Sequence, residues 1–354
     1  MKTIRFGIIG AGLMGREFAS ASARWCHLPR MDVRPDVDAV YCAVPHNLHR
    51  EVFSAAIESG KHLMGEKPFG IDLAANEAIL AAARAHPDVF VRCCSQFPFF
   101  PAVQEIGRRV EDGQIGEVIE VETGFLHSSD LNPNKPINWK RRIESNGAYG
   151  VLGDLGMHAC HVPFRAGWRP RNVRAILSNL VPQRPDRSGA LVPCETWDNG
   201  TLLCEMEDPA SGRTFPWTFK AFRISPGQKN TWYVNILGTR TSVRWSTRNP
   251  KRLDVLEYDG GEQVWGQVEL GAQTAFETIT AGIFETGFSD AVQQMWAAYL
   301  HELVHGSPPS RFAGCVRPDE AHLSHQLFTA ALESHRTGAT VPVPAADTRR
   351  GRCG

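Results

Sequence analysis

The first third of the chain alternates between short apolar runs and amphipathic stretches. Residues 3–9 (Thr-Ile-Arg-Phe-Gly-Ile-Ile) predict a buried strand, and the turn from Gly10 to Gly15 opens a helix that reaches about Trp25. Further strands are predicted over 37–44, 61–64 and 89–94, and they alternate with helices over 49–60 and 74–85. This alternation is typical of a parallel sheet covered by helices.

The pattern changes after Gly116 to longer β-type runs separated by loops rich in proline and glycine. These runs occupy residues 118–125, 201–207, 231–237 and 242–246, and helices are expected over 290–305 and 318–336. We therefore predict an α/β protein in which a shortened Rossmann-type parallel-sheet domain precedes an α+β domain with an open, largely antiparallel sheet. The predicted division is 1–117, 118–346 and a flexible tail, 347–354.

The amino-acid composition and net charge of the chain narrow the classes of binding partner. The 38 Lys and Arg residues balance 38 Asp and Glu residues, which removes the basic excess that nucleic acid or an anionic membrane surface would attract. No run approaches 18 apolar residues, and Met1–Gly12 is too short for a signal-peptide core. The nine cysteines are odd in number, scattered and without C-x-x-C spacing, as expected in a reducing cytoplasm. We expect a cytoplasmic protein with a small-molecule substrate.

The glycine turn has the composition of a dinucleotide fingerprint. It reads Gly10-Ala11-Gly12-Leu13-Met14-Gly15 and lies between a predicted strand and a predicted helix. Glycines permit the tight turn, the approach of the backbone to a pyrophosphate and close packing of helix on strand, while the helix N-terminus favours the anion. The alternative is a tight turn that binds nothing.

A second candidate group is Glu66-Lys67-Pro68, which follows the predicted strand over 61–64. Ligands of open α/β sheets bind at the carboxyl ends of the strands. A cationic nicotinamide beside Lys67 would disfavour the ammonium form, so proton exchange with a substrate hydroxyl would be feasible near neutral pH. The alternative is a solvated surface charge.

The third group runs from Gly153 to His161 (Gly-Asp-Leu-Gly-Met-His-Ala-Cys-His). If this segment is helical, Asp154 and His158 share one face, and the carboxylate can orient an imidazole that shuttles a proton. A metal site at His158 and His161 is not expected, because no carboxylate or cysteine ligands converge by spacing. The alternative is a helix start with a capping aspartate and a hydrogen-bonded histidine.

The order of these groups and the sequences around them resemble those of the Gfo/Idh/MocA family of nicotinamide-dependent oxidoreductases. The resemblance covers most of the chain and is strongest in its first half. It rests on Val37-Asp38-Ala39-Val40, Pro45, His49, Gly60-Lys61-His62, Glu66-Lys67-Pro68, the pair Trp139-Lys140, and the Asp154-x-x-x-His158 spacing.

The resemblance implies NAD or NADP as cofactor, a sugar, polyol or related cyclic alcohol as substrate, and a homo-oligomer. It implies that Lys67, Asp154 and His158 serve the substrate carbinol and that Trp139 and Lys140 shape the substrate side. Pro45, His46 and His49 would border the nicotinamide ribose. The expected cofactor-binding set is Gly10, Gly12, Leu13, Met14, Gly15, Pro45, His46, His49, Glu66 and Lys67.

Two departures from the family pattern stand out. Residues 27–38 contain prolines and charges and predict a loop where the family has further β/α material, so roughly one βαβ unit of about 30 residues is missing. Only Asp32 and Asp36 are near enough to read the adenosine ribose, which leaves the choice between NAD and NADP open. The other departure is His161, which replaces an acidic residue that often follows the histidine motif.

These observations favour hydride transfer between a secondary alcohol and the nicotinamide, with His158 as general base, Asp154 orienting it and Lys67 polarising the oxygen. One rival is an NAD-dependent glycoside hydrolase, which uses the cofactor transiently. The other is a nucleotide- or sugar-binding protein or inactive remnant, whose shortened first domain no longer holds a dinucleotide.

Overall fold

The computed structural model describes residues 5–10, 12–23, 38–270, 274–278 and 286–344. Its N-terminal part is a parallel sheet in the order β1-β2-β3-β4, as the β/α alternation predicts. The strands are β1 (Arg5–Ile9), β2 (Asp38–Cys42), β3 (His62–Gly65) and β4 (Val91–Cys93). The helices of this part are α1 (Leu13–Ala23), α2 (His49–Glu58), α3 (Leu73–Ala85) and α4 (Pro101–Glu111), of which α4 was not predicted.

The described part of the N-terminal sheet has four strands. Within the described residues β1 pairs with β2 alone, so β1 is an edge strand. Ile8 and Ile9 are 43% and 41% exposed as a result. Asp32 and Asp36, the predicted candidates for the adenosine ribose, lie outside the described residues.

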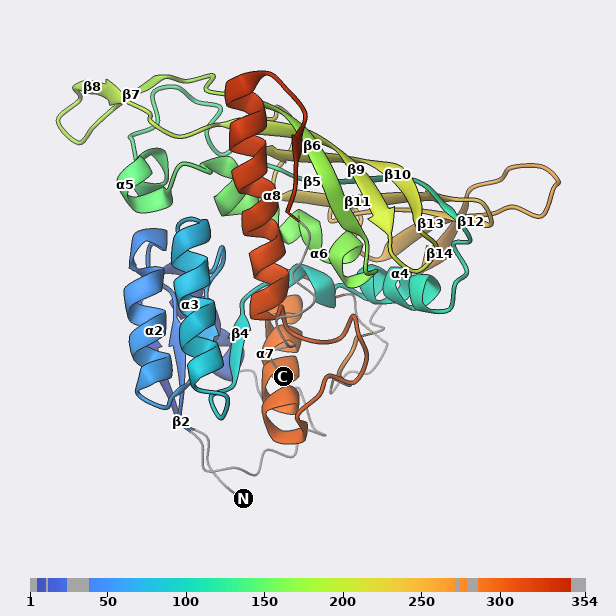
Figure 1. The fold of residues 1–354 in the computed structure, drawn as a ribbon, viewed down its shortest axis with the longest axis horizontal. Coiled ribbons are helices and arrows are strands. Elements are labelled where there is room, and N and C mark those ends of the chain that lie inside the picture. Colours follow the sequence, from blue (N-terminus) through green and yellow to red (C-terminus); the bar gives the residue numbers. More distant parts are fainter. Residues whose placement is uncertain (1–4, 11, 24–37, 271–273, 279–285, 345–354) are drawn as a thin grey trace.

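Helices cover both faces of the N-terminal sheet. α2 and α3 pack on one face, and α7 (Phe288–His305) lies with α1 on the other (Figure 1). Trp296 of α7 joins an aromatic cluster there, with ring centroids 4.3 Å from Phe18, 5.1 Å from Tyr41 and 5.7 Å from Phe6. A helix from the segment assigned by sequence to the second domain therefore completes the core of the first sheet.

The second sheet has nine strands in the order β14-β13-β12-β11-β5-β10-β9-β6-β15. Only the pairing of β5 with β10 is parallel, which confirms the prediction of a largely antiparallel sheet. Its strands are β5 (Val118–Leu126), β6 (Arg169–Ser178), β9 (Asn199–Asp208), β10 (Arg213–Phe222), β11 (Thr231–Gly238), β12 (Thr241–Ser246), β13 (Arg252–Glu257), β14 (Gly266–Glu269) and β15 (Val341–Pro342). A separate hairpin pairs β7 (Gln183–Pro185) with β8 (Leu191–Pro193).

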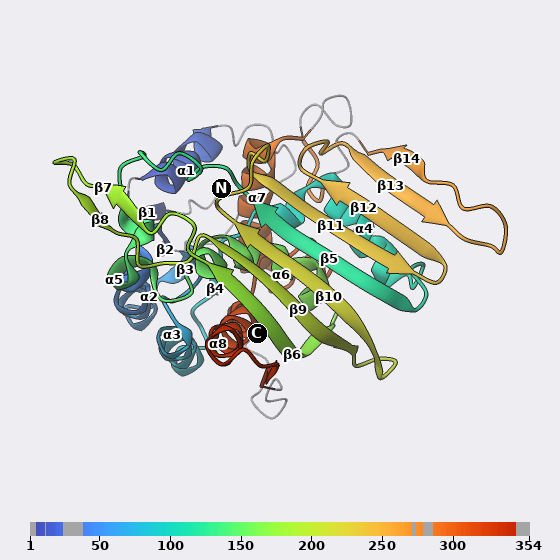
Figure 2. The ribbon, with the colours of Figure 1, turned by 90° about the horizontal axis from the view of Figure 1, so that it is seen from above.

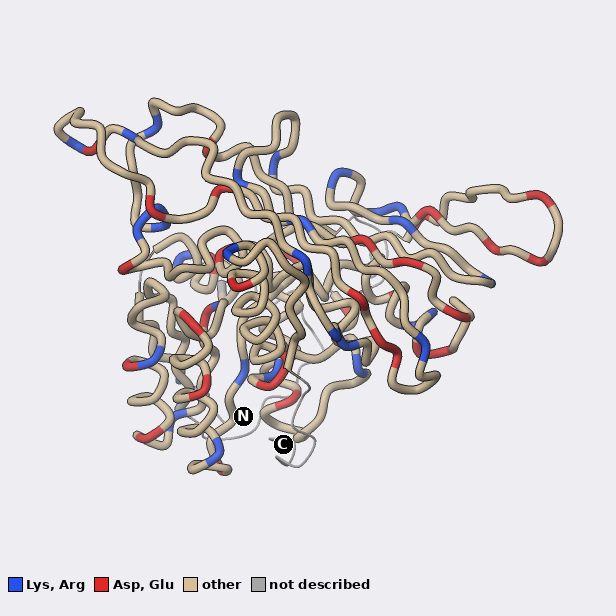
Figure 3. Tube along the Cα trace, turned by 45° about the horizontal axis from the view of Figure 1, so that its top comes forward, with Lys and Arg blue, Asp and Glu red and all other residues tan. Residues whose placement is uncertain are grey.

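One face of this sheet is covered and the other is open. α6 (Met157–Arg165) and α8 (Pro318–Thr337) pack against this sheet, and Figure 2 shows α6 behind the strands and α8 beside β6. Burial alternates accordingly, so Leu202 and Cys204 of β9 are buried while Leu203 between them is 53% exposed. Acidic and basic residues are interspersed along the described chain (Figure 3).

Candidate active site

The predicted groups meet at the carboxyl edge of the parallel sheet. Gly10 follows β1, Pro45 lies beyond β2, Lys67 follows β3 and Ser95 follows β4. The helical turn Leu152–Gly156, which leads into α6, contacts this edge through Asp154 and Lys67. Such an edge is where ligands of open parallel sheets bind.

The glycine turn has the steric properties of a dinucleotide fingerprint. Gly10 has φ +99°, and a Cβ there would lie 2.1 Å from the carbonyl oxygen of Ala43. A Cβ on Gly15 would lie 2.1 Å from the carbonyl oxygen of Gly10. Gly12 differs, because a Cβ there would meet no atom within 4 Å. The first and third glycines thus pack the turn, while the second leaves open space beside the N-terminus of α1, as a pyrophosphate requires.

Three cations converge on the carboxyl group of Asp154. Lys67 Nζ lies 2.5 Å from its main-chain oxygen and 3.2 Å from Oδ1. Lys140 Nζ lies 3.0 Å from both carboxylate oxygens, and Arg223 Nη2 lies 3.0 Å from Oδ2. Burial by itself raises the pKa of Asp154, but Lys140, Lys67 and Arg223 together hold that pKa well below its usual value. Asp154 is therefore an ionised, buried carboxylate.

His158 is oriented by Ser95. Its Nδ1 lies 2.7 Å from Ser95 Oγ, and the rings of Phe97 and Phe125 pack against it. Burial lowers the pKa of His158 well below 6.5, and Lys67 lowers it further, so the imidazole is neutral. A neutral imidazole is the form that accepts a proton.

The predicted orientation of His158 by Asp154 is not seen as a hydrogen bond between the two side chains. Among the hydrogen bonds of the described residues, the Asp154 carboxylate binds cations and His158 Nδ1 binds Ser95. The segment starts as a π-helical turn, Leu152–Gly156, before α6 begins at Met157. Helical spacing brought the two residues close, but three cations outside the segment compete for the carboxylate.

The loop that carries Lys67 is fixed by side chains from three elements. His325 Nε2 of α8 lies 2.7 Å from the Pro68 carbonyl oxygen, and Asn76 Nδ2 donates to the Phe69 carbonyl at 2.9 Å. The Gly70 amide donates to His49 Nδ1 at 3.2 Å. Phe69 has φ +68°, a strained conformation for a bulky residue that these contacts maintain.

His49 does not fit its expected place beside a ribose. It is fully buried, and its second ring nitrogen, Nε2, lies 3.1 Å from the Val44 carbonyl oxygen. With both nitrogens engaged by the backbone, neither is left for a ribose hydroxyl. His49 instead joins the end of β2 to the Lys67 loop.

The other predicted residues lie around the opening or beneath it. Trp139 is 38% exposed, and its ring stands perpendicular to that of His46 at 5.1 Å. His46 Nδ1 lies 3.2 Å from the Asn146 carbonyl oxygen, and Pro45 precedes it at the start of a short 3-10 turn. Glu66 is buried and accepts a hydrogen bond from Tyr41 at 2.7 Å. Burial raises the pKa of this carboxyl.

Sequence reasoning missed Ser95 and Arg223. Ser95 follows a parallel strand, so the strand-end rule that selected Lys67 could have selected it too. Arg223 follows β10, a strand whose proline at position 216 lowers its strand signal. His161 lies apart from the site, with Nδ1 2.6 Å from Glu320 Oε1. Within the described residues no group of three His, Cys, Asp or Glu side chains is arranged to hold a metal ion.

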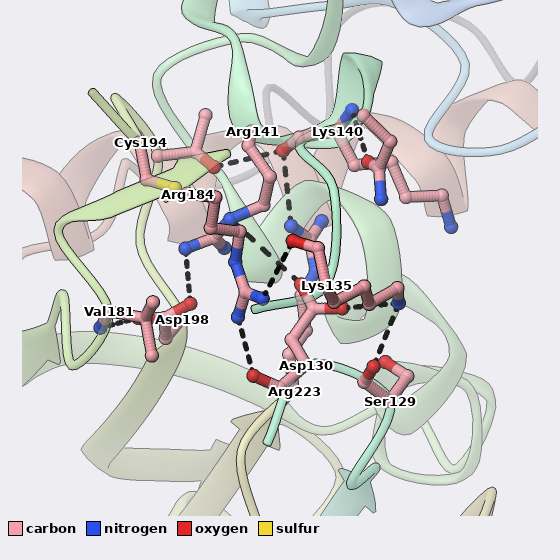
Figure 4. Close-up of polar contacts among 12 residues, drawn as sticks. Ser129, Asp130, Lys135, Lys140, Arg141, Val181, Arg184, Cys194, Asp198 and Arg223 are labelled. Atoms are coloured by element: carbon pink, nitrogen blue, oxygen red, sulfur yellow. Dashed lines mark hydrogen bonds and ion pairs between the residues drawn. The ribbon is translucent and has the colours of Figure 1, made fainter. Parts of the chain in front are cut away.

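A buried polar network lies behind Lys140 (Figure 4). Arg141 pairs with Asp198, and Lys135 binds Asp130 at 2.7 Å. Further contacts tie this network to the site, because Arg223 Nη1 donates to the Lys140 carbonyl at 3.1 Å and Arg184 Nη2 donates to the Asp130 carbonyl. Asp130, Arg141, Arg184, Asp198 and Arg223 are all buried.

Two family models match this chain. Residues 20–92 match the model described as "Oxidoreductase family, NAD-binding Rossmann fold", and residues 103–244 match the "GFO/IDH/MocA C-terminal domain". The matched ranges include Lys67, Lys140, Asp154, His158 and Arg223. No helix among the described residues is both long and apolar enough to cross a membrane.

Individual relatives agree with the family models. Levoglucosan dehydrogenase of Pseudarthrobacter phenanthrenivorans is 30% identical over 62% of this chain and 58% of its own length. Inositol 2-dehydrogenase of Rhizobium meliloti is 24% identical over 73% of this chain and 80% of its own length. The sequence alignment with levoglucosan dehydrogenase thus spans under two thirds of that enzyme's length. A solved structure of levoglucosan dehydrogenase with NADH and L-sorbose has the same fold, with a TM-score of 0.83, 21% identity and coverage of 98% of this chain and 100% of that one.

Proposed function

The chain belongs to the Gfo/Idh/MocA family of oxidoreductases, and we propose that it is a nicotinamide-dependent dehydrogenase acting on a secondary alcohol of a sugar-like or polyol substrate. One observation carries this proposal. Lys67, at the end of a strand of the NAD-binding fold, binds Asp154 beside the neutral His158, which lies in α6. A charged donor and a proton acceptor are thus brought together where a nicotinamide ring would lie.

The first part of the proposal concerns the cofactor. The open space at Gly12, beside the N-terminus of α1, fits the pyrophosphate of NAD or NADP. Gly10, Leu13, Met14 and Gly15 would line it, and Pro45, His46 and Lys67 would lie toward the nicotinamide. When bound, the cofactor supplies the hydride acceptor for alcohol oxidation.

The second part concerns the residues that act on the alcohol. His158 takes the hydroxyl proton, with its ring held through Nδ1 by Ser95. Lys67 donates to the same oxygen and stabilises the negative charge that develops on it. Asp154 keeps Lys67 and Lys140 in place through its ion pairs, and so acts as a positioning residue.

The experiment that tests this proposal has two stages. Calorimetric titration of the purified protein with NADH and with NADPH is expected to show micromolar binding of at least one of them. NAD(P)+ reduction is then measured with a panel of sugars and polyols. Lys67→Met should lower kcat/KM about 100-fold or more, since it removes a donor to the developing charge. Lys220→Met, on the outward side of β10, is the matched control and should behave as the unmodified protein.

A binding protein or inactive remnant is the second candidate function. The observation that favours it is the position of β1 at the edge of a sheet of only four described strands. The same titration separates the two candidates. If the folded protein binds neither NADH nor NADPH, the dehydrogenase proposal is wrong.

We also propose that the protein is a homo-oligomer of the reducing cytoplasm. The open face of the nine-stranded sheet carries Ile176 and Leu203, which are 62% and 53% exposed on neighbouring strands, and a second copy could cover them. The seven cysteines in the described part of the chain are free and buried, which supports a reducing compartment.

A further inference from the structure

Positive charge exceeds negative charge around the proposed reacting oxygen. Lys67, Lys140 and Arg223 all pair with one carboxylate, that of Asp154. Three positive charges on one negative charge leave an excess of two. The other carboxyl close to Lys67 is Glu66, whose pKa is raised by burial and which is bound by Tyr41. This carboxyl therefore offsets the excess only weakly.

The buried network behind the site does not compensate for this charge. Its buried charges are Arg141 and Arg184 against Asp130 and Asp198, and Lys135, whose side chain is 37% exposed, also binds Asp130 (Figure 4). The buried charges of this network therefore balance and leave the excess at Asp154 uncompensated. Charges in a buried setting act more strongly than on the surface, because the local dielectric constant is low.

Hydrogen-bond donors also exceed acceptors here. Arg223 Nε, Arg184 Nε and Arg141 Nη1 are buried and have no partner among the described residues. A buried donor without an acceptor destabilises the fold, whereas an oxygen-rich anion would satisfy it. Arg223 is the donor nearest the reacting groups, since its Nη2 already binds Asp154 and its Nη1 binds the Lys140 carbonyl.

Lys140 is the most exposed of the three cations that pair with Asp154. Its side chain is 40% exposed, against 17% for Lys67 and 3% for Arg223. Lys140 Nζ directs two hydrogen bonds at Asp154 and has a third proton to donate. This proton can bind an oxygen of a ligand carboxylate, and the buried Arg223 adds positive charge behind it.

We propose that the substrate is a sugar acid, a polyhydroxylated compound with a carboxylate that binds Lys140, with Arg223 behind it. The carboxylate would anchor the molecule while a neighbouring carbinol faces Lys67 and His158. This inference rests on the proposed dehydrogenase function and names the class of its substrate. It requires that a ligand with a carboxylate binds better than its neutral counterpart.

Matched ligand pairs test the proposal directly. Hexuronates and aldonates are each titrated against the neutral sugar or alditol of the same configuration, with and without NADH. At least one acid should bind tenfold or more tightly than its neutral partner, and the preference should weaken as salt is raised. The proposal is overturned if no acid exceeds its neutral partner, or if hexose phosphates bind more tightly than every acid.

Variants at Lys140 test whether this residue causes the preference for the acid over its neutral partner. Lys140→Gln should reduce the preference for the acid about tenfold or more, whereas Lys140→Arg should retain it because the charge remains. Arg187→Gln, in the loop between β7 and β8, removes the same net charge away from the site and should change nothing. An undiminished preference in Lys140→Gln contradicts the proposal. If the unmodified protein does not bind NADH or NADPH, the dehydrogenase function is refuted separately. Titrations with sugar acids in the absence of cofactor still report on the anion site.

Discussion

The two sheets of this protein differ in strand length and in how their apolar side chains are buried. The nine-stranded sheet has four strands of nine or ten residues and alternates buried with outward-facing side chains. The N-terminal sheet has four described strands of three to five residues, and its edge strand exposes Ile8 and Ile9. The difference shows that the first sheet depends on packing from elsewhere, whereas the second builds most of its own core.

The support for the small sheet comes from the C-terminal part of the chain. Trp296 closes the aromatic cluster on one face, and Arg92 of β4 forms a buried ion pair with Glu302 of α7 at 2.8 Å. The backbone of Cys93 in β4 also forms an isolated antiparallel β-bridge with Val316. The site lies where these parts meet, since Lys67 comes from one sheet and Arg223 from the other.

The largest expected effect is loss of the support that α7 gives to the small sheet. Trp296→Ala should lower the free energy of unfolding by about 3–5 kcal/mol, because it leaves a cavity among three aromatic rings. Urea denaturation measures this change. Trp265→Ala is the matched control, since Trp265 stacks with Arg244 outside that core, and it should cost about 1 kcal/mol or less. Equal losses in the two variants would show that α7 does not support the sheet.

Low pH should lower the stability of the protein through two buried histidines, His49 and His325, which hold the loop that carries Lys67. Burial lowers the pKa of His49 to about 3 and that of His325 to about 4, against 6.5 when unfolded. Below pH 6.5 the unfolded chain therefore binds protons that the folded chain does not, so stability falls as the pH drops. At pH 5 each histidine should account for about 2 kcal/mol of lost unfolding free energy.

Urea denaturation at pH 7 and pH 5 checks this prediction. His49→Gln combined with His325→Gln removes both titrations, and the double variant should lose less stability between the two pH values than the unmodified protein does. The same pH dependence in both proteins would mean that these histidines are not the acid-sensitive groups.

The smallest effect is expected at the exposed edge. Ile8→Thr should change the unfolding free energy by about 0.5 kcal/mol or less, since the side chain is half exposed. Ile236→Thr, at a fully buried position of β11, should destabilise by about 2 kcal/mol or more. Chemical denaturation compares the two. A large loss from Ile8→Thr would mean that β1 is covered in solution, for example by a second copy.

Local sequence predicted much of the fold. The apolar runs gave each of the four strands of the first sheet to within a few residues, and glycine spacing located the turn after β1. Strands β6 and β10 were missed, since proline interrupts each of them and outward-facing charges mask the alternation. Strand-end position also placed Lys67 at the correct edge of the sheet.

What the sequence determined by itself were features set by neighbouring residues: the β/α order, the tight turn at Gly10, and the closeness of Asp154 to His158 along one helical segment. What only the tertiary structure decided were the partners of those residues. Ser95 is 63 positions from His158, and Lys67 is 87 positions from Asp154. Periodicity reports which face a side chain occupies. The partner of a buried carboxylate depends on the charged groups that distant segments place beside it. Here three cations bind the oxygens of Asp154, which helical spacing had predicted to face a histidine.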